Sequence, residues 1–261
     1  SRLGGEVLRA GEDSAVLEKM RADGQWAFST DAFVVTPLFF PGGDIGRLAV
    51  FGTVNDLAAA GARPQFLSLA VILEEGLDLG VLERVTDSVA QAAKEAQVEV
   101  VCGDTKVVEG GSADGIFVCT AGVGLIEGEP ARPTRVRPGD AVVLSGTIGD
   151  HEMAVLLARE ALPFQAEVES DCAPLGEMVA AVREKVEVHA MRDPTRGGLA
   201  AALNEIAAQA KVQIEIEEEA IPVSPGVAQA CDLLGFDVLH LANEGKMLFL
   251  SLIHISEPTR P

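Results

Sequence analysis

The chain has 261 residues, which is enough for one large domain or two medium ones, each with its own core. Its formal net charge of −20 argues against a nucleic-acid-binding or anionic-membrane-binding protein, because both partners attract basic surfaces. The apolar content of 48%, with 27 glycines and few aromatic residues, favours an α/β protein with many tight turns.

Cysteine usage and hydropathy narrow the class further. The four cysteines, Cys102, Cys119, Cys172 and Cys231, show no Cys-x-x-Cys spacing, so we expect reduced thiols and a cytoplasmic location. Cys102 and Cys119 fall in apolar segments, and we expect both in the core. No apolar run is long enough to span a membrane. The sequence opens at Ser1 without a signal-peptide pattern, and we expect that a native start has been lost.

Strands and helices are predicted to alternate in the first half. Trp26–Thr30 is predicted as a strand that ends at Asp31, and Asp44 is predicted as the N-cap of a helix that Gly61 stops. The further elements are the strand Gln65–Glu74, the helix Leu79–Ala96, the strand Val98–Cys102 ending at Asp104, and the strand Ile116–Ile126.

The second half repeats this alternation more loosely. Glu127–Pro138 is rich in Pro and Arg, which places a domain boundary between residues 1–130 and 131–250. The predicted strands are Ala141–Ser145, Val188–Met191, Val212–Ile216 and Met247–Leu250. The predicted helices run from after His151 to about Ala161, over Ala173–Glu184, and from after Gly198 to about Ala210, and a short helix is predicted after Pro225. Residues 251–261, SLIHISEPTRP, show no related periodicity, so we expect a non-native tail and a truncated second domain.

The predicted helix that follows Asp44 carries Asn55 and Asp56 within an otherwise apolar stretch. A carboxylate is seldom kept in such surroundings unless a positive group meets it. The structural alternative is a hydrogen-bonded core aspartate, and the helix alone leaves both interpretations open.

Other aspartates recur at predicted strand ends and turns, several of them beside Gly, Ser or Thr: Asp13, Asp31, Asp104, Asp150 and Asp193. If they converge with Asp56, the carboxylates repel one another unless cations neutralise them. Carboxylates without His or Cys ligands favour Mg²⁺ with a nucleotide over zinc or iron. The sequence has no Walker A or Gly-x-Gly-x-x-Gly motif, and each aspartate alone is as well explained as a helix cap.

Several of these segments, in this order, resemble the PurM-like (aminoimidazole ribonucleotide synthetase) superfamily: Asp13–Val16, Ser29–Asp31, Asn55–Ala58, Gly103–Thr105 and Asp193–Leu199. Longer motifs closely resemble the HypE family of hydrogenase maturation proteins: Thr36–Gly46, Gly103–Val108, Ser145–His151, Glu169–Leu175, Arg192–Leu199 and Ala242–Lys246. Together they cover roughly residues 12–250.

The resemblance implies a two-domain α/β (α+β) fold of the PurM-like type. The N-terminal mixed sheet is expected to form a barrel across a homodimer, and the C-terminal domain is expected to be an α/β sandwich. The implied cofactors are ATP and Mg²⁺. The implied activity is ATP-dependent dehydration of a carbamoyl group on the protein's own C-terminal cysteine to a thiocyanate, which provides cyanide for NiFe-hydrogenase. The implied partners are the carbamoyltransferase HypF and a HypC–HypD scaffold.

Site residues follow from the residue chemistry together with the resemblance. The expected nucleotide-binding residues are Asp13, Asp31, Asn55, Asp56, Asp104, Thr105 and Lys106, and the expected Mg²⁺ ligands are Asp13, Asp31, Asp56, Asp104 and Asp193. For catalysis we expect Glu244 as the base, Lys106 as a stabiliser of negative charge and His151 as a proton relay. Their structural alternatives are a surface turn carboxylate, a surface ion pair and a structural histidine.

No cysteine lies near the end of the sequence, so the acceptor thiol that the resemblance implies is missing from it. Two other functions therefore stay open. One is a PurM-like synthetase or kinase acting on a small molecule, and the other is a nucleotide-binding scaffold without turnover.

Overall fold

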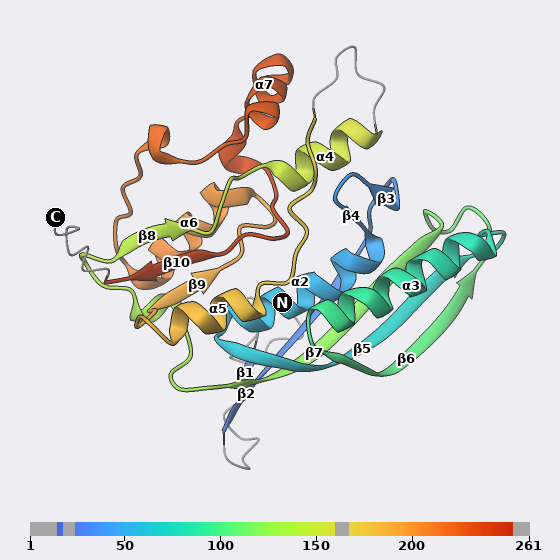
Figure 1. The fold of residues 1–261 in the computed structure, drawn as a ribbon, viewed down its shortest axis with the longest axis horizontal. Helices are drawn as coiled ribbons and strands as arrows, with labels where there is room; N and C mark the ends of the chain where they lie inside the picture. Colours follow the sequence, from blue (N-terminus) through green and yellow to red (C-terminus); the bar gives the residue numbers. More distant parts are fainter. Residues whose placement is uncertain (1–14, 18–23, 160–166, 253–261) are drawn as a thin grey trace, which may run out of the picture.

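The computed structural model describes residues 15–17, 24–159 and 167–252. Two units are visible, each with its own sheet and helices, and they meet along one long helix, α2 (Figure 1). The first unit ends with strand β7 (Ile116–Ile126), and the second begins with the 3₁₀ turn η1 (Pro133–Arg135).

The first unit contains a five-stranded mixed sheet. Its order is β1 (Ala15–Leu17), β2 (Gln25–Phe33), β7, β5 (Ala62–Glu74) and β6 (Glu99–Val108). Only β5 and β6 run parallel, because helix α3 (Leu79–Glu95) forms the crossover between them.

Helices cover one face of this sheet. Along β7 buried and half-buried residues alternate without a break, so every second side chain points toward α2 (Ile45–Ala59) and α3. No element among the described residues covers the other face. There Phe28 and Phe66 keep 39% and 40% of their surface exposed. Below we call this uncovered side the open face.

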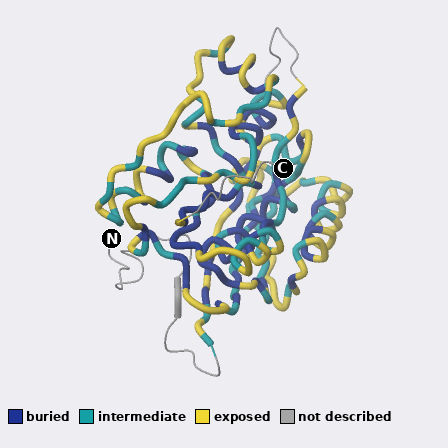
Figure 2. The backbone as a smooth tube through the Cα atoms, turned by 60° about the vertical axis from the view of Figure 1, so that its left-hand side comes forward, coloured by how far each residue is buried: buried dark blue, intermediate teal, exposed yellow. Residues whose placement is uncertain are grey.

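Helix α2 is bounded as the sequence predicts. Asp44 caps it by accepting hydrogen bonds from the amides of Gly46 and Arg47, and Gly61 follows its end with a φ of 85°. Of its fifteen residues only Arg47 and Asp56 are not buried, because the sheet, α3 and the second unit surround it. Buried backbone accordingly runs through the middle of the molecule in Figure 2.

The second unit is built on a three-stranded antiparallel sheet in the order β8 (Ala141–Leu144), β10 (Leu248–Ser251) and β9 (Ala190–Arg192). Its helices are α4 (Asp150–Arg159), α5 (Gly176–Arg183), α6 (Gly198–Ala210) and α7 (Pro225–Leu234). A two-residue hairpin from the first unit, β3 (Phe39–Phe40) and β4 (Gly43–Asp44), contacts α4. Two short 3₁₀ turns, η2 (Glu218–Ala220) and η3 (Val238–His240), flank α7.

Five sequence predictions need correction. Asp31 and Asp104 lie inside β2 and β6 and not at strand ends, because both strands extend beyond the apolar residues that define them in the sequence. Neither predicted core cysteine lies in the core: Cys102 is exposed, since β6 is an edge strand, and Cys119 is half-buried. Val212–Ile216 forms no strand, because no described strand pairs with it.

The predicted fold class, a two-domain α/β protein with a mixed N-terminal sheet, is confirmed. The barrel across a homodimer remains a prediction. Among the described residues there is no helix long and apolar enough to cross a membrane.

Candidate active site between the two units

Two predicted site residues, Asp31 on β2 and Asp56 on α2, lie along the seam between these two elements. The Ser29 hydroxyl donates to the Asp56 carboxylate across 2.7 Å. Asp31 follows Ser29 by two residues, so it points to the same side of β2, and its carboxylate lies near Gly52, one helical turn before Asp56. Glycine at position 52 leaves room for the Phe33 ring, because a Cβ atom there would lie 2.7 Å from that ring.

Acidic residues of the second unit face this seam. Burial raises the pKa of Glu244 well above its ordinary value, and the negative charges of Asp193, Asp171 and Asp31 raise it further. Burial also raises the pKa of Asp31, while its bond from the Ala32 amide and the positive charge of Arg196 oppose that shift. The charges of Asp31, Asp171 and Asp193 all act on Glu244, and these four residues, which come from both units, are called the acidic cluster below.

The turn that carries Glu244 is fixed by its neighbour Asn243, which is fully buried. The Asn243 side chain accepts from the Gly149 amide and donates to the carbonyls of Pro194 and Leu241, at 2.8 to 3.0 Å. These bonds connect the turn to the start of α4 and to the loop after β9, which begins with Asp193.

Two cations lie near the cluster. The Lys246 ammonium is 3.4 Å from the Asp171 carboxylate and 3.9 Å from that of Asp150, and only 15% of its side chain is exposed. Arg196, in the loop that precedes α6, acts electrostatically on Asp31. From the sequence, no role is predicted for Asp171, Arg196 or Lys246, although all three fall within the motifs that resemble the HypE family.

Asp104, Thr105 and Lys106 are not brought to this cluster within one chain. Across the sheet Asp104 aligns with Ala70, Cys119 and Ala32, which point to the open face, whereas Asp31 points to the helix side. Three strand spacings separate β2 from β6, about 14 Å. The predicted convergence of Asp31, Asp56 and Asp104 therefore fails inside a single subunit.

Two other predicted residues have structural partners. Asn55 bonds to the backbone of the second unit, as described below. His151 is buried, with its Nδ1 atom 2.9 Å from the Ser170 hydroxyl and its ring edge-on to Phe40. Burial lowers the pKa of His151, while the negative charge of Asp171 opposes that shift, and the role of proton relay stays a prediction.

Asp13 and Asp193 are the remaining predicted site residues. Asp13 lies outside the described residues. Asp193 is buried directly after β9 and belongs to the acidic cluster.

Among the described residues no three His, Cys, Asp or Glu side chains form a ready-made metal cage. A Mg²⁺ ion held mainly by nucleotide phosphates and water needs only one or two protein carboxylates. Asp31 and Asp56 fit that requirement, because they share one seam and a cation would offset the burial that raises the pKa of Asp31.

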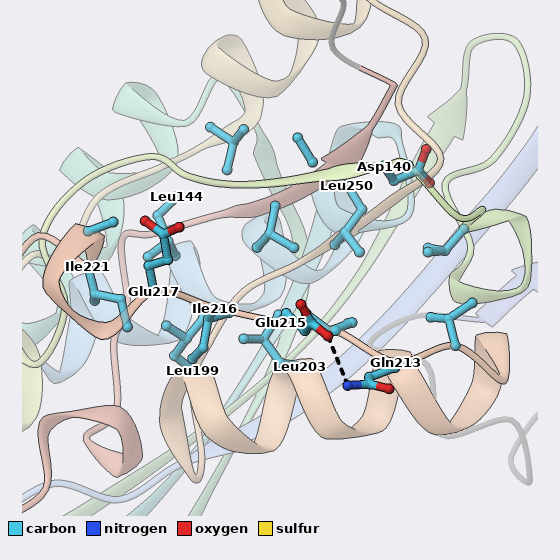
Figure 3. A pocket seen from close by; sticks show the side chains of 18 of the residues that line it. Asp140, Leu144, Leu199, Leu203, Gln213, Glu215, Ile216, Glu217, Ile221 and Leu250 are labelled. Atoms are coloured by element: carbon cyan, nitrogen blue, oxygen red, sulfur yellow. Dashed lines mark hydrogen bonds between the residues drawn. The ribbon is translucent and has the colours of Figure 1, made fainter.

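A cavity of about 640 Å³ lies elsewhere, between β8, α6 and the unpaired segment 212–217 (Figure 3). Its walls carry aliphatic residues such as Leu144, Leu199, Leu203 and Leu250 together with polar ones such as Glu217. The polar Glu215 in it is bonded to its neighbour Gln213 at 3.1 Å. None of the predicted site residues lines this cavity, so it is not the candidate active site.

Comparison with known proteins agrees with this architecture. The family model "AIR synthase related protein, N-terminal domain" matches residues 11–126, and the corresponding C-terminal domain matches residues 137–252. The chain therefore belongs to the AIR synthase-related proteins, a class of two-domain α/β proteins.

Its relatives define the family more narrowly. The chain is 52% identical over 244 residues to the carbamoyl dehydratase HypE of Rhizobium leguminosarum bv. viciae, covering 92% of this chain and 69% of that protein. It is 46% identical to the HypE of Escherichia coli K12, covering 91% and 72%. Within its class, the chain belongs to the carbamoyl dehydratase HypE family.

Solved structures give the same result. A HypE–HypF complex matches with a TM-score of 0.89 and 49% identity, over 95% of this chain and 81% of that one. A HypE bound to ATP matches with a TM-score of 0.87 and 47% identity, over 97% and 75%.

Proposed function

We propose that this protein uses ATP to dehydrate an S-carbamoyl cysteine to a thiocyanate during hydrogenase maturation. The observation that carries the proposal is Glu244, a carboxylate on a turn at the junction of the two units, where its carbonyl accepts from Asn55 of α2 and its amide donates to Asp171. Such a group is suited to proton abstraction next to a phosphoryl-transfer site. Family relatives named carbamoyl dehydratase and a relative solved with ATP support this assignment.

The reaction balances without a further co-reactant. The γ-phosphoryl group of ATP is transferred to the carbamoyl oxygen and makes it a leaving group. The two protons on the carbamoyl nitrogen are lost, the C–O bond breaks, and thiocyanate, ADP and phosphate remain. In this scheme Glu244 accepts a proton from the nitrogen, and its raised pKa makes the carboxylate a stronger base than an exposed glutamate.

On the nucleotide side, we propose that Asp31 and Asp56 hold Mg²⁺, with Asp193 and Asp13 as further candidate ligands. When bound, the ion would neutralise charge on the transferring phosphoryl group. Lys246 is held against Asp171 next to Glu244, which keeps one positive charge inside the acidic cluster.

We propose that Asp104, Thr105 and Lys106 act on the nucleotide or the carbamoyl oxygen of a second subunit. They lie on edge strand β6, beside an open face that carries exposed apolar residues such as Phe28 and Phe66. An apolar sheet face of this kind favours burial against a copy of itself. If two subunits pack against each other through this face, their N-terminal sheets can form the barrel that the sequence analysis predicts.

The proposal extends to partners and compartment. We propose that a HypF protein loads the carbamoyl group, since a relative was solved as a HypE–HypF complex, and that a HypC–HypD scaffold accepts the cyanide. All four cysteines lie in the described residues and none is in a disulfide, which suits the reducing cytoplasm.

The test is ATP hydrolysis by this chain, with a carbamoylated cysteine peptide supplied in trans. We expect the peptide to stimulate hydrolysis and to leave as a thiocyanate, detectable by mass as the loss of one water. The Asp56→Asn variant should lose at least about tenfold in affinity for ATP with Mg²⁺.

A Ser29→Ala variant serves as the matched control, because it removes the hydrogen bond to Asp56 but keeps the carboxylate. Stimulation by a phosphate-accepting metabolite instead of the peptide would indicate a small-molecule kinase or synthetase. ATP binding without any stimulation would indicate a scaffold.

A further inference from the structure

Asn55 is placed to act on the second unit and not on a nucleotide. The residue is 1% exposed on α2. Its Nδ2 group donates to the carbonyls of Ala173 at 3.0 Å and Glu244 at 3.1 Å, and its Oδ1 atom accepts from the Leu175 amide at 2.8 Å. Both donor hydrogens of the side chain are therefore used, and none is left for a nucleotide.

The main chain of Glu244 is held from its other side as well. Its amide donates to the Asp171 carboxylate at 3.1 Å. The next residue, Gly245, lies so close to the Asp171 carbonyl that a Cβ atom would sit 1.7 Å from it. The peptide groups around Glu244 are thus fixed by Asn55 from the first unit and by Asp171 from the second.

Neighbouring residues of α2 serve the two parts of the site. Asp56 turns toward Ser29 on β2, where we place the metal and the nucleotide, whereas Asn55 turns toward the turn that carries Glu244. Because α2 is almost entirely buried, its backbone is a rigid link between them.

We propose that Asn55 is a positioning residue that sets the place of Glu244 relative to the phosphoryl-transfer site. This rests on the proposed function, in which Glu244 is the base. General-base catalysis needs the accepting oxygen within hydrogen-bond reach of the proton, so a shift of about 1 Å in the Glu244 turn costs far more in turnover than in nucleotide affinity.

The experiment compares Asn55→Ala and Asn55→Ser with the control Asn204→Ala, all in the full chain. Asn204 lies on α6 and donates a single hydrogen bond, to the Ala200 carbonyl of its own helix at 2.8 Å. For the Asn55 variants we expect peptide-stimulated kcat to fall by about 10–100-fold, while KM for ATP stays within twofold. The control should change neither quantity. Asn55→Ser, which keeps a small polar group, covers the case in which the alanine variant does not fold.

A double-mutant cycle separates positioning from a general structural role. If Asn55 acts through Glu244, its replacement should have little further effect in a Glu244→Gln background. Additive losses, or an unchanged kcat per folded molecule, would overturn the proposal.

Amide hydrogen exchange tests the same contacts without relying on activity. Asn55→Ala should speed exchange in segments 171–176 and 243–247, and Asn204→Ala should not. Faster exchange in 171–176 alone would show that Asn55 does not hold the Glu244 turn. If the wild-type chain shows no peptide-stimulated hydrolysis but the exchange result holds, the proposed function fails while the contact role of Asn55 stands.

Discussion

At the scale of single residues, Glu244 shows how a common side chain acquires an uncommon property. Burial is the larger cause of its raised pKa, and the negative charges of Asp193, Asp171 and Asp31 add to it. A carboxyl whose pKa is higher in the folded than in the unfolded chain binds its proton more tightly when folded. It therefore lowers stability progressively as the pH rises from the ordinary glutamate value through the raised pKa.

Replacing Glu244 should lower activity but raise stability at alkaline pH. Glu244→Gln should lower peptide-stimulated turnover at least about hundredfold. It should also raise the melting temperature at pH 8, because the variant buries no charge. The rise should be about 2–4 °C for each kcal/mol that burying the charged carboxylate costs, and no rise is expected near pH 4.5.

The two halves of this prediction are checked by thermal melts at both pH values and by the hydrolysis assay. The exposed Glu219→Gln is the control and should change neither turnover nor melting temperature. A melting temperature of Glu244→Gln that is unchanged at pH 8 would contradict the burial argument.

At the scale of elements, helix α2 organises the molecule because it is buried between the sheet of the first unit and helices of both units. Its end is closed by Gly61, whose φ of 85° suits glycine and whose carbonyl accepts a hydrogen bond from the Arg183 guanidinium. Arg183 also donates to the carbonyl of Glu129 at 2.6 Å. The helix end is thus tied to the segment that joins the two units.

Gly61→Ala should therefore destabilise the protein for two reasons. The left-handed backbone costs about 1–2 kcal/mol for alanine, and the new Cβ atom would lie 2.0 Å from the Arg183 guanidinium. Gly76→Ala separates the two effects, because Gly76 has a φ of 93° but a Cβ atom there would meet no heavy atom within 4 Å beyond its chain neighbours. Urea unfolding should show the larger loss for Gly61→Ala. Equal losses would mean that the Arg183 contact contributes nothing.

At the scale of the whole molecule, the open face of the N-terminal sheet and the exposed strand β6 bear on the proposal that two subunits share one site. Lys106 and Glu244 lie on opposite sides of the sheet within a subunit. If both act in one reaction, as we propose, a second copy must supply one of them.

This division of labour predicts complementation between inactive variants. Lys106→Ala and Glu244→Gln should each be inactive, but a randomly assembled mixture should regain about one quarter of wild-type activity. In such a mixture half of the dimers are mixed, and each has one intact site of two. Co-expression with two different tags and assay of the total dimer pool measures this recovery.

A mixture of Lys106→Ala with Asp104→Asn is the control, because both changes fall on β6 and should leave every site damaged. Absence of recovery in dimers that carry both tags would place Lys106 and Glu244 in the same subunit or outside one site.

Much of the fold was predictable because its signals are local. The cap at Asp44, the stop at Gly61 and the apolar periods of Leu79–Ala96 and Ile116–Ile126 depend on neighbouring residues alone. The segment Val212–Ile216 has the same alternating pattern as a strand, yet it is unpaired, because a strand also needs a partner that its own sequence does not encode.

The sequence by itself determined the order of the elements, the family through its motifs, and the residue types from which a site for Mg²⁺ and a nucleotide can be built. Only the tertiary structure decided how they are arranged: the charge of Asp31 acts on Glu244 across the two units, Asn55 binds the second unit, and Asp104 and Lys106 lie on the open face. The physical reason is that a side chain's face on a strand or helix is set by register and by what packs against it. Those contacts come from segments far away in the chain, such as the 189 positions that separate Asn55 from Glu244.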